Sequence, residues 1–242
     1  MLKGQLARCC PGVTAVGAVS PSLVRAMVDW STIASAATAG GTLVLAMATF
    51  YSVRSANVAA RVAERSLQVG LRPFLMPSRI EDPAVKVNFL DEHWVHIRGG
   101  MGMVEENDGN VYMVMGLRNA GSGLAVLHGW FVSRQPEDRV SWSREMTPPE
   151  PDQFRRLGRD LYVPGGDIGF WQGAIRDPGD PCLKLVRTAI EDGAPLIVDL
   201  LYGDQDGGQR TISRFSLTAR QDGEERLAAV ARHWFLDRAD PR

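Results

Sequence analysis

A long uncharged segment near the N-terminus is the strongest hydrophobic pattern in the chain. Over Trp30–Val53, 24 residues pass without Asp, Glu, Lys, Arg or His. At a rise of 1.5 Å per residue, about 20 helical residues cross the hydrocarbon core of a bilayer. Trp30 and Tyr51 lie near its two ends, where aromatic side chains favour the membrane interface. The pattern predicts a transmembrane helix over residues 28–54.

Two other structures share this hydrophobic pattern: a buried, alanine-rich core helix and a cleaved signal peptide. The apolar run is longer than that of a signal peptide, and basic residues follow it as they follow a stop-transfer segment. Residues 1–27 show no sustained hydrophobic period, and Met27 stands directly before the predicted span. We interpret residues 1–27 as a disordered or mis-annotated extension, with translation starting at Met1 or at Met27.

Residues 55–72 continue the helical pattern beyond the predicted span. Spacings of seven and four residues place Arg54, Arg61 and Arg65 on one helix face. Such a cationic stripe suits the anionic headgroups of a cytoplasmic leaflet, and it equally suits an exposed helical stalk. The stretch Gly70–Pro73 is expected to end this juxtamembrane helix.

The flanking charges predict the orientation of the span. Four arginines follow it within about 20 residues, whereas Arg25 is the one basic residue close before it. The positive-inside rule therefore places the C-terminal domain in the cytoplasm of a single-pass cell-membrane protein. The single cysteine of that domain, Cys182, agrees with a reducing compartment. An outward-facing envelope component is the alternative.

Small residues spaced four apart within the span indicate a way for two helices to approach. Ala36 and Gly40 form one such pair, and Ala37 and Gly41 form another. The predicted partners are therefore the lipid bilayer, through residues 30–53, and a second copy of the chain, through the transmembrane helix. Alanine-rich spans also produce these pairs by chance.

From residue 80 onward, the hydrophobic pattern changes to the short period of β-strands, which predicts a β-sandwich domain over residues 80–242. Asn107–Asn110 is a hairpin signal, because Asp-Gly and Gly-Asn pairs tolerate positive φ. The expected strands are 84–90, 93–98, 103–106, 111–118, 124–133, 169–175, 195–202 and 211–218. Large core side chains are expected from Trp94, Trp130, Trp142, Trp171 and Trp234.

One helix interrupts these strands. Asp180 is a suitable N-cap, Pro181 suits the first turn, and Gly193 follows the expected end. Residues 226–236 fit either a last strand or a C-terminal helix, and we favour the strand. The expected fold is mainly β: an immunoglobulin-like β-sandwich with one inserted helix, preceded by the long transmembrane and juxtamembrane helix.

Composition and charge narrow the classes of function. Hydrophobic residues make up 45% and charged residues 23%, which excludes a disordered chain. Residues 1–72 carry seven basic and two acidic residues, and the rest carries 20 basic and 26 acidic residues. The large acidic part would be repelled by nucleic acid, so no nucleic-acid partner is expected.

The order of parts resembles a group of uncharacterised single-pass bacterial membrane proteins. The residues that carry the resemblance are the apolar stretch Trp30–Val53, the Ala/Arg-rich Arg54–Gly70, the exit Leu71–Pro73, and the turn Leu117–Ala125 with its Asn119 and glycines. In that group a short N-terminal anchor and a juxtamembrane helix precede a β-sandwich. The resemblance implies this architecture, and it implies no activity, cofactor or catalytic residue.

No pattern of catalytic, cofactor-binding or metal-ligating residues stands out. His93 and His96 would point to opposite faces of a strand, which does not suit one metal ion. Cys182 lies in a capped first helical turn, but no histidine is adjacent to act as its base. Asp204–Gly207 has only part of a calcium loop. The predicted site residues all belong to the membrane interface: Trp30, Tyr51, Arg54, Arg61 and Arg65.

The sequence therefore favours a membrane-anchored, cytoplasm-facing protein-interaction or accessory domain. The rival hypothesis is a hydrolase-type enzyme whose residues come from distant loops. A cleft that gathers Asp167, His128 or Cys182 with a shifted pKa would favour the enzyme.

Overall fold

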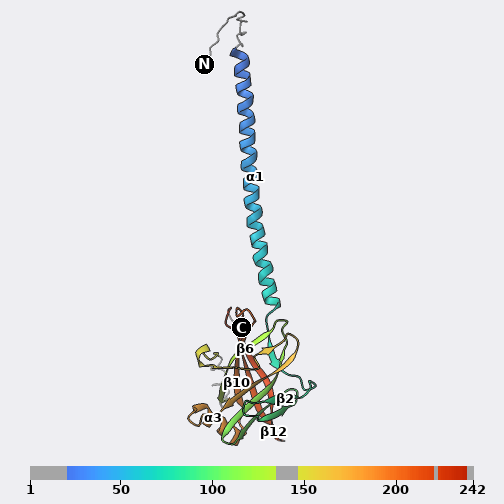
Figure 1. Ribbon diagram of the computed structural model, residues 1–242, viewed down its shortest axis with the longest axis vertical. Helices are drawn as coiled ribbons and strands as arrows, with labels where there is room; N and C mark the ends of the chain where they lie inside the picture. The colour runs from blue at the N-terminus through green and yellow to red at the C-terminus, as the bar shows by residue number, and fades with distance from the viewer. Residues whose placement is uncertain (1–20, 135–146, 221–222, 239–242) are drawn as a thin grey trace, which may run out of the picture. The chain divides into compact units, whose positions relative to one another are not determined.

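The computed structural model describes residues 21–134, 147–220 and 223–238, with side-chain surroundings omitted for 21–29, 68–69 and 223–224. The chain divides into two compact units, Met1–Ala63 and Glu64–Arg242. Predicted features in residues 1–20, Trp142 and the last four residues lie outside the described ranges. Figure 1 shows the long helix α1 and the β domain that follows it.

Helix α1 runs without interruption over Pro21–Gly70, so the predicted transmembrane and juxtamembrane segments form one helix. Its segment Trp30–Leu67 is long and apolar enough to cross a membrane, with a mean hydropathy of 1.6 in its most apolar window. None of that window is buried within the structure. By length and composition, this helix fits a membrane anchor or a signal sequence.

The second unit is mainly β, as expected, and its described residues contain one α-helix beyond the end of α1. Ten strands form one antiparallel sheet, whose order is β1-β5-β4-β12-β11-β10-β6-β7, with β8 paired to β6 and β9 paired to β5. A separate hairpin pairs β2 with β3. The strands are β1 (Leu75–Pro77), β2 (Val85–Asn88), β3 (Trp94–Ile97), β4 (Met101–Asn107), β5 (Asn110–Asn119), β6 (Ala125–Arg134), β7 (Arg155–Arg156), β8 (Tyr162–Val163), β9 (Ile168–Ile175), β10 (Leu196–Gly203), β11 (Thr211–Arg220) and β12 (Gly223–Phe235), with a 3-10 turn η1 at Pro151–Gln153.

The large sheet curls into a half-barrel, and the immunoglobulin-like topology of the sequence-based prediction is not shown. The central strand β10 is buried along its whole length, which fits its nearly continuous apolar sequence. In Figure 1, β6, β10 and β12 run through the same sheet. The predicted last strand over residues 226–236 is confirmed by β12, which pairs with β11 and β4.

Helix α3 (Pro181–Glu191) packs its apolar side chains Leu183, Val186 and Ala189 into the main core of the half-barrel. The residues predicted to begin and end this helix are confirmed. The Asp180 side chain caps the N-terminus by accepting from the Cys182 N–H, and Gly193 follows the end with a φ of +62°.

A second core lies where the β2–β3 hairpin packs against the half-barrel. Val87, Phe89, Val95 and Ile97 of the hairpin segment contact Tyr112 and its neighbours. This packing orders the turn that carries Asp91, and the position of that turn matters for the candidate site below.

Candidate functional site

The apolar part of α1 satisfies its own polar groups. The hydroxyl groups of Thr38, Thr42 and Thr49 donate to backbone carbonyls one turn earlier, at 2.8–3.0 Å. A hydroxyl that finds its acceptor inside the same helix is compatible with a hydrocarbon environment, which offers no partner of its own. The predicted aromatic residues Trp30 and Tyr51 are 74% and 64% exposed, and 21 helical residues separate them by about 32 Å.

The predicted arginines Arg54, Arg61 and Arg65 are all exposed on the continuing helix. Because α1 is helical throughout, the spacing of seven and four residues does place them on one face. Their contact with a membrane interface is a prediction that the structure does not test.

The exit from α1 packs closely on the turn after β5. A Cβ atom on Gly123 would lie 1.7 Å from the Leu71 carbonyl oxygen, and one on Gly121 would lie 2.2 Å from that of Arg72. Only glycine leaves room for this approach. The turn Leu117–Ala125, which carried the sequence resemblance, is therefore the surface that receives the helix exit.

Asn119 holds this junction together from a fully buried position. Its Oδ1 accepts from the backbone N–H groups of Phe74 and Gly121, both at 3.0 Å. Its Nδ2 donates to the carbonyls of Gly123 and Val163 at 2.7 and 3.0 Å. The amide therefore uses all four of its hydrogen-bonding positions.

Arg72 connects the segment after α1 to the residues that follow β12. Its guanidinium donates to both carboxylate oxygens of Asp237, at 3.0 and 2.5 Å, and lies over the ring of Phe235. Burial raises the pKa of Asp237, but the bonds from Arg72 outweigh it and hold that pKa below its ordinary value.

A cavity of about 320 Å³ lies where the half-barrel stays open. We call it the seam cavity. It lies between β9 and the segment 155–159. The first two residues of this segment form β7, which pairs with β6. Its lining includes Trp130, Leu157, Gln172 and four arginines: Arg155, Arg156, Arg159 and Arg176. Among the described residues that line it, none is acidic.

Three of the four arginines are held by carboxylates just outside the lining. Arg155 pairs with both oxygens of Asp180 and lies over the ring of Trp130. Arg159 bonds Asp160 at 2.8 Å. Arg176 donates to Asp91 at 3.0 Å, and the Tyr112 hydroxyl donates to the same oxygen at 2.5 Å. These pairs fix the positions of the cationic groups around the cavity.

The remaining arginine, Arg156, is exposed and makes no ion pair within the described part of the chain. Gln172, by contrast, is only 7% exposed. Its Nε2 donates to Asp160 at 2.5 Å, whereas its Oε1 is buried with no hydrogen-bond partner among the residues that the structure describes. Periodicity in the sequence gave no signal for this cavity, because its residues come from the β2–β3 hairpin segment, β6, the segment 155–159 and the β9 region.

Asp91 has the most strongly shifted carboxyl pKa near this cavity. Burial raises it, but hydrogen bonds from Arg176 and Tyr112 outweigh burial and lower the pKa of Asp91 to about 2. The carboxylate therefore stays ionised and keeps Arg176 in place over the whole physiological pH range.

A second cavity of about 570 Å³ is lined by His128, Asp152, Phe154, Arg156, Leu201 and Arg210. Burial, and then the nearby Arg210, lower the pKa of His128. Its Nε2 is buried, and no described residue forms a hydrogen bond with it. Of the three residues proposed for an enzyme, His128 alone lines either of these two cavities. Asp167 and Cys182 line neither of them.

The other chemical candidates have structural surroundings. His93 stacks on Tyr112 and contacts Glu105, whereas His96 is exposed. The Asp204 carboxylate accepts from the N–H groups of Gly208 and Gln209 and so orders the β10–β11 turn. Within the described ranges, no group of three or more His, Cys, Asp or Glu side chains is placed to hold a metal ion.

No protein-family model matches the chain, and no curated protein matches it significantly. Of the predicted resemblance to single-pass membrane proteins, the structure therefore supports the order of parts: a long apolar helix followed by a mostly antiparallel β domain.

Proposed function

We propose that this chain is a membrane-anchored, cytoplasm-facing protein-interaction domain. The observation that carries the proposal is the complete exposure of the apolar segment of α1. Leu43, Leu45 and Phe50 are each more than 60% exposed. Transfer of such a side chain out of water contributes about 1.5–3 kcal/mol, so a lipid environment explains a helix that the protein itself does not cover.

The length and flanks of the apolar run support a retained anchor over a cleaved signal sequence. The uncharged stretch Trp30–Val53 is longer than the apolar region of a signal peptide, and arginines follow it as they follow a stop-transfer segment. The helix also continues past this stretch to Gly70.

The cytoplasmic orientation rests on the charge asymmetry. Arg54, Arg61 and Arg65 follow the apolar segment, and the positive-inside rule retains such residues on the cytoplasmic side. The second cavity holds His128, whose pKa is lowered, and this feature favours the hydrolase alternative. We favour interaction because neither cavity brings His128 together with Asp167 or Cys182, so no nucleophile and base are paired there. Dimerisation through Ala36, Gly40, Ala37 and Gly41 remains part of the proposal, since small residues allow close helix contact.

Membrane fractionation of cells that express the chain with a C-terminal tag tests the proposal. Membranes are washed at high pH, and spheroplasts are treated with protease before the tag is detected. Retention of a protected tag supports the anchor and the orientation. Retention of a digested tag overturns the orientation, and release into the soluble fraction overturns the anchor.

A matched pair of double variants sharpens this experiment. Leu43→Arg with Leu45→Arg places two charges in the apolar segment, at a cost of about 2.5–3.5 kcal/mol each in the membrane. Val62→Arg with Leu67→Arg places the same charges on equally exposed positions beyond it. Only the first variant is expected to leave the membrane fraction.

A further inference from the structure

We propose that the seam cavity binds an extended acidic peptide segment of a partner protein. This inference rests on the proposed interaction function and names the site and the ligand chemistry. The argument uses three features: an unpaired strand edge, a set of oriented cations and a buried acceptor without a donor.

The first feature is the free edge of β9. Along Ile168–Ile175 this strand pairs with β5 on one side. Within the described part of the chain, no backbone hydrogen bond is made along the other edge of residues 169–175. A strand edge without a backbone partner is the element to which an extended peptide adds as a further strand.

The space along the free edge of β9 is closed near Gly169 and opens into the seam cavity towards Arg176. A Cβ on Gly169 would lie 2.9 Å from a methyl group of Val163 on β8, which shows close packing there. The bond from Gln172 to Asp160 bridges the seam further along. Beyond this bridge, Gly173, Ala174 and Arg176 line the cavity, so the free edge borders the cavity over that stretch.

The second feature is the charge of the walls. Arg155, Arg156 and Arg159 lie on one wall and Arg176 on the other. Carboxylates outside the lining already orient Arg155, Arg159 and Arg176, whereas Arg156 is exposed and has no ion pair in the described residues. These carboxylates neutralise three of the four guanidinium groups, so Arg156 is the one left to pair a carboxylate of the ligand.

The third feature is Gln172 Oε1. A buried polar atom without a partner is costly and rare in folded proteins. This acceptor calls for an N–H or O–H donor from a ligand, since the described residues provide none. The backbone N–H groups of a peptide supply that donor, and the acidic side chains of the same peptide supply carboxylates for Arg156. A simple inorganic anion offers no such donor.

The floor of the cavity fits a peptide better than a highly polar solute. Trp130 is 4% exposed and packs edge-to-face on Trp171, with ring centroids 5.6 Å apart. Gly173 lies against both rings, because a Cβ there would approach them to 2.9 and 3.2 Å. An uncharged side chain that alternates with the acidic ones would cover this aromatic floor.

Fluorescence anisotropy with the full chain in a nonionic detergent tests the proposal. The probe is a fluorescein-labelled peptide of alternating Glu and Thr, about as long as β9, and the matched control alternates Lys and Thr. We expect saturable binding of the acidic peptide alone, weakened at high salt. Failure of the acidic peptide to bind overturns the inference and leaves the fractionation result untouched.

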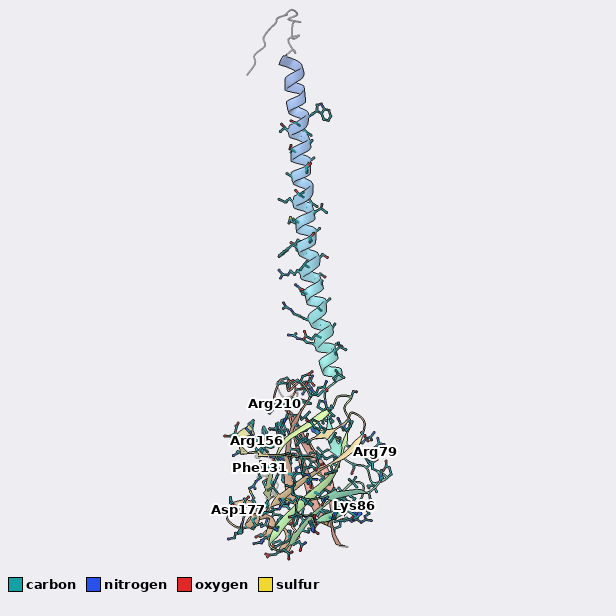
Figure 2. The ribbon with its side chains drawn as sticks, viewed as in Figure 1. Arg79, Lys86, Phe131, Arg156, Asp177 and Arg210 are labelled. Carbon is teal, nitrogen blue, oxygen red and sulfur yellow. The ribbon has the colours of Figure 1, made fainter. Side chains whose placement is uncertain are left out.

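The variants separate the seam cavity from other cationic surfaces. Arg156 also lines the second cavity, so Arg210→Glu, which changes the second cavity alone, should bind like the parent chain. Arg156→Glu is expected to weaken binding at least about tenfold, because it replaces attraction by repulsion. Arg79→Glu is the matched control, since Arg79 is also exposed and Figure 2 labels it on the other side of the domain. A variant with Arg54, Arg61 and Arg65 all changed to Gln should bind like the parent chain. Equal loss in the controls overturns the assignment.

Two further measurements test the mode of binding. Peptides with alternate backbone amides N-methylated, in either of the two registers, keep their charge but block one set of hydrogen bonds. One register must lose binding if the peptide adds to β9, and unchanged binding of both overturns strand addition. Citrate is the small-anion control. Binding of citrate that depends on Arg156, with no binding of the peptide, overturns the peptide in favour of a small organic anion.

Discussion

The guanidinium of Arg72 holds both carboxylate oxygens of Asp237, a residue 165 positions further along the chain. Arg72 follows the end of α1, and Asp237 follows the last strand. The side chain of Arg72 is 9% exposed and that of Asp237 is 28% exposed, so solvent screens this pair less than an ordinary surface ion pair. The two ends of the β domain are thereby joined at the point where the helix enters.

A double-mutant cycle on this pair should reveal a coupling of about 1–2 kcal/mol, above that of typical exposed pairs. The variants are Arg72→Met, Asp237→Asn and their combination. Urea unfolding in detergent, followed by tryptophan fluorescence, measures each free energy of unfolding. The exposed pair Arg79–Glu81, at 4.0 Å, provides the control cycle and should show coupling near zero. Equal coupling in the two cycles would contradict the special role of Arg72.

Asn119→Ala should lower the free energy of unfolding by at least about 2–3 kcal/mol, because two donors and two acceptors lose their buried partner. Asn88→Ala is the matched control. The Asn88 Oδ1 has no hydrogen-bond partner among the described residues, so its removal should leave stability unchanged or raise it slightly. If both variants unfold at the same urea concentration, the four bonds of Asn119 do not contribute as described.

The stability supplied by Asp91 should depend on acidity. Its pKa in the folded protein is lowered to about 2 from an ordinary value of 3.8. A lowered pKa means that the contribution is present above the unfolded value and is lost as pH falls through the folded value. The difference in unfolding free energy between the parent chain and Asp91→Asn should therefore be constant above about pH 5 and shrink between about pH 4 and pH 2. A difference that does not change with pH would refute this origin.

Arg226→Met should lower the free energy of unfolding by about 1–3 kcal/mol. Arg226 is 4% exposed, and its guanidinium donates to the carbonyls of Ala194 and Ala189 at the end of α3, at 2.7 and 3.2 Å. Burial lowers its pKa, so part of the gain is offset by the cost of desolvating the charge. Hydrogen exchange should accelerate most near the end of α3. The exposed Arg220→Met serves as control and should leave both measurements unchanged.

Local signals predicted the local parts of this fold. The continuous helix, the capped helix after Asp180 and the last strand are all confirmed by α1, α3 and β12. The arrangement of strands was not predictable in this way, because pairs such as β5 with β9 join residues 50 to 64 positions apart. Hydrophobic periodicity identifies the face that a strand buries, and it carries no information about which strand lies beside it.

Individual side chains show the same limit. Trp130, Trp171 and Trp234 are buried as expected, but the expectation for Trp94 is wrong: it is 53% exposed and lies beneath the Lys86 ammonium on the β2–β3 hairpin. On β12 the polar residue is the buried one, since Arg226 points inward and Leu227 is 42% exposed. Arginine is usually exposed and leucine usually buried. Here the carbonyls at the end of α3 accept hydrogen bonds from Arg226 and so allow its burial, and these carbonyls are brought to Arg226 by the tertiary structure. The seam cavity depends on such long-range neighbours throughout.

The junction at Asn119 also determines how the protein responds to mechanical tension. Any pull along α1 reaches the β domain through Leu71–Phe74, where the Phe74 N–H is held by Asn119 Oδ1 and its carbonyl by the Ala120 N–H. Beyond it, the three-residue β1 is attached along β5 by a short ladder. We therefore expect tension along α1 to separate the short β1 from β5 before it disrupts the longer ladders of β10, β11 and β12. The rest of the sheet would then stay folded while the entry segment is extended.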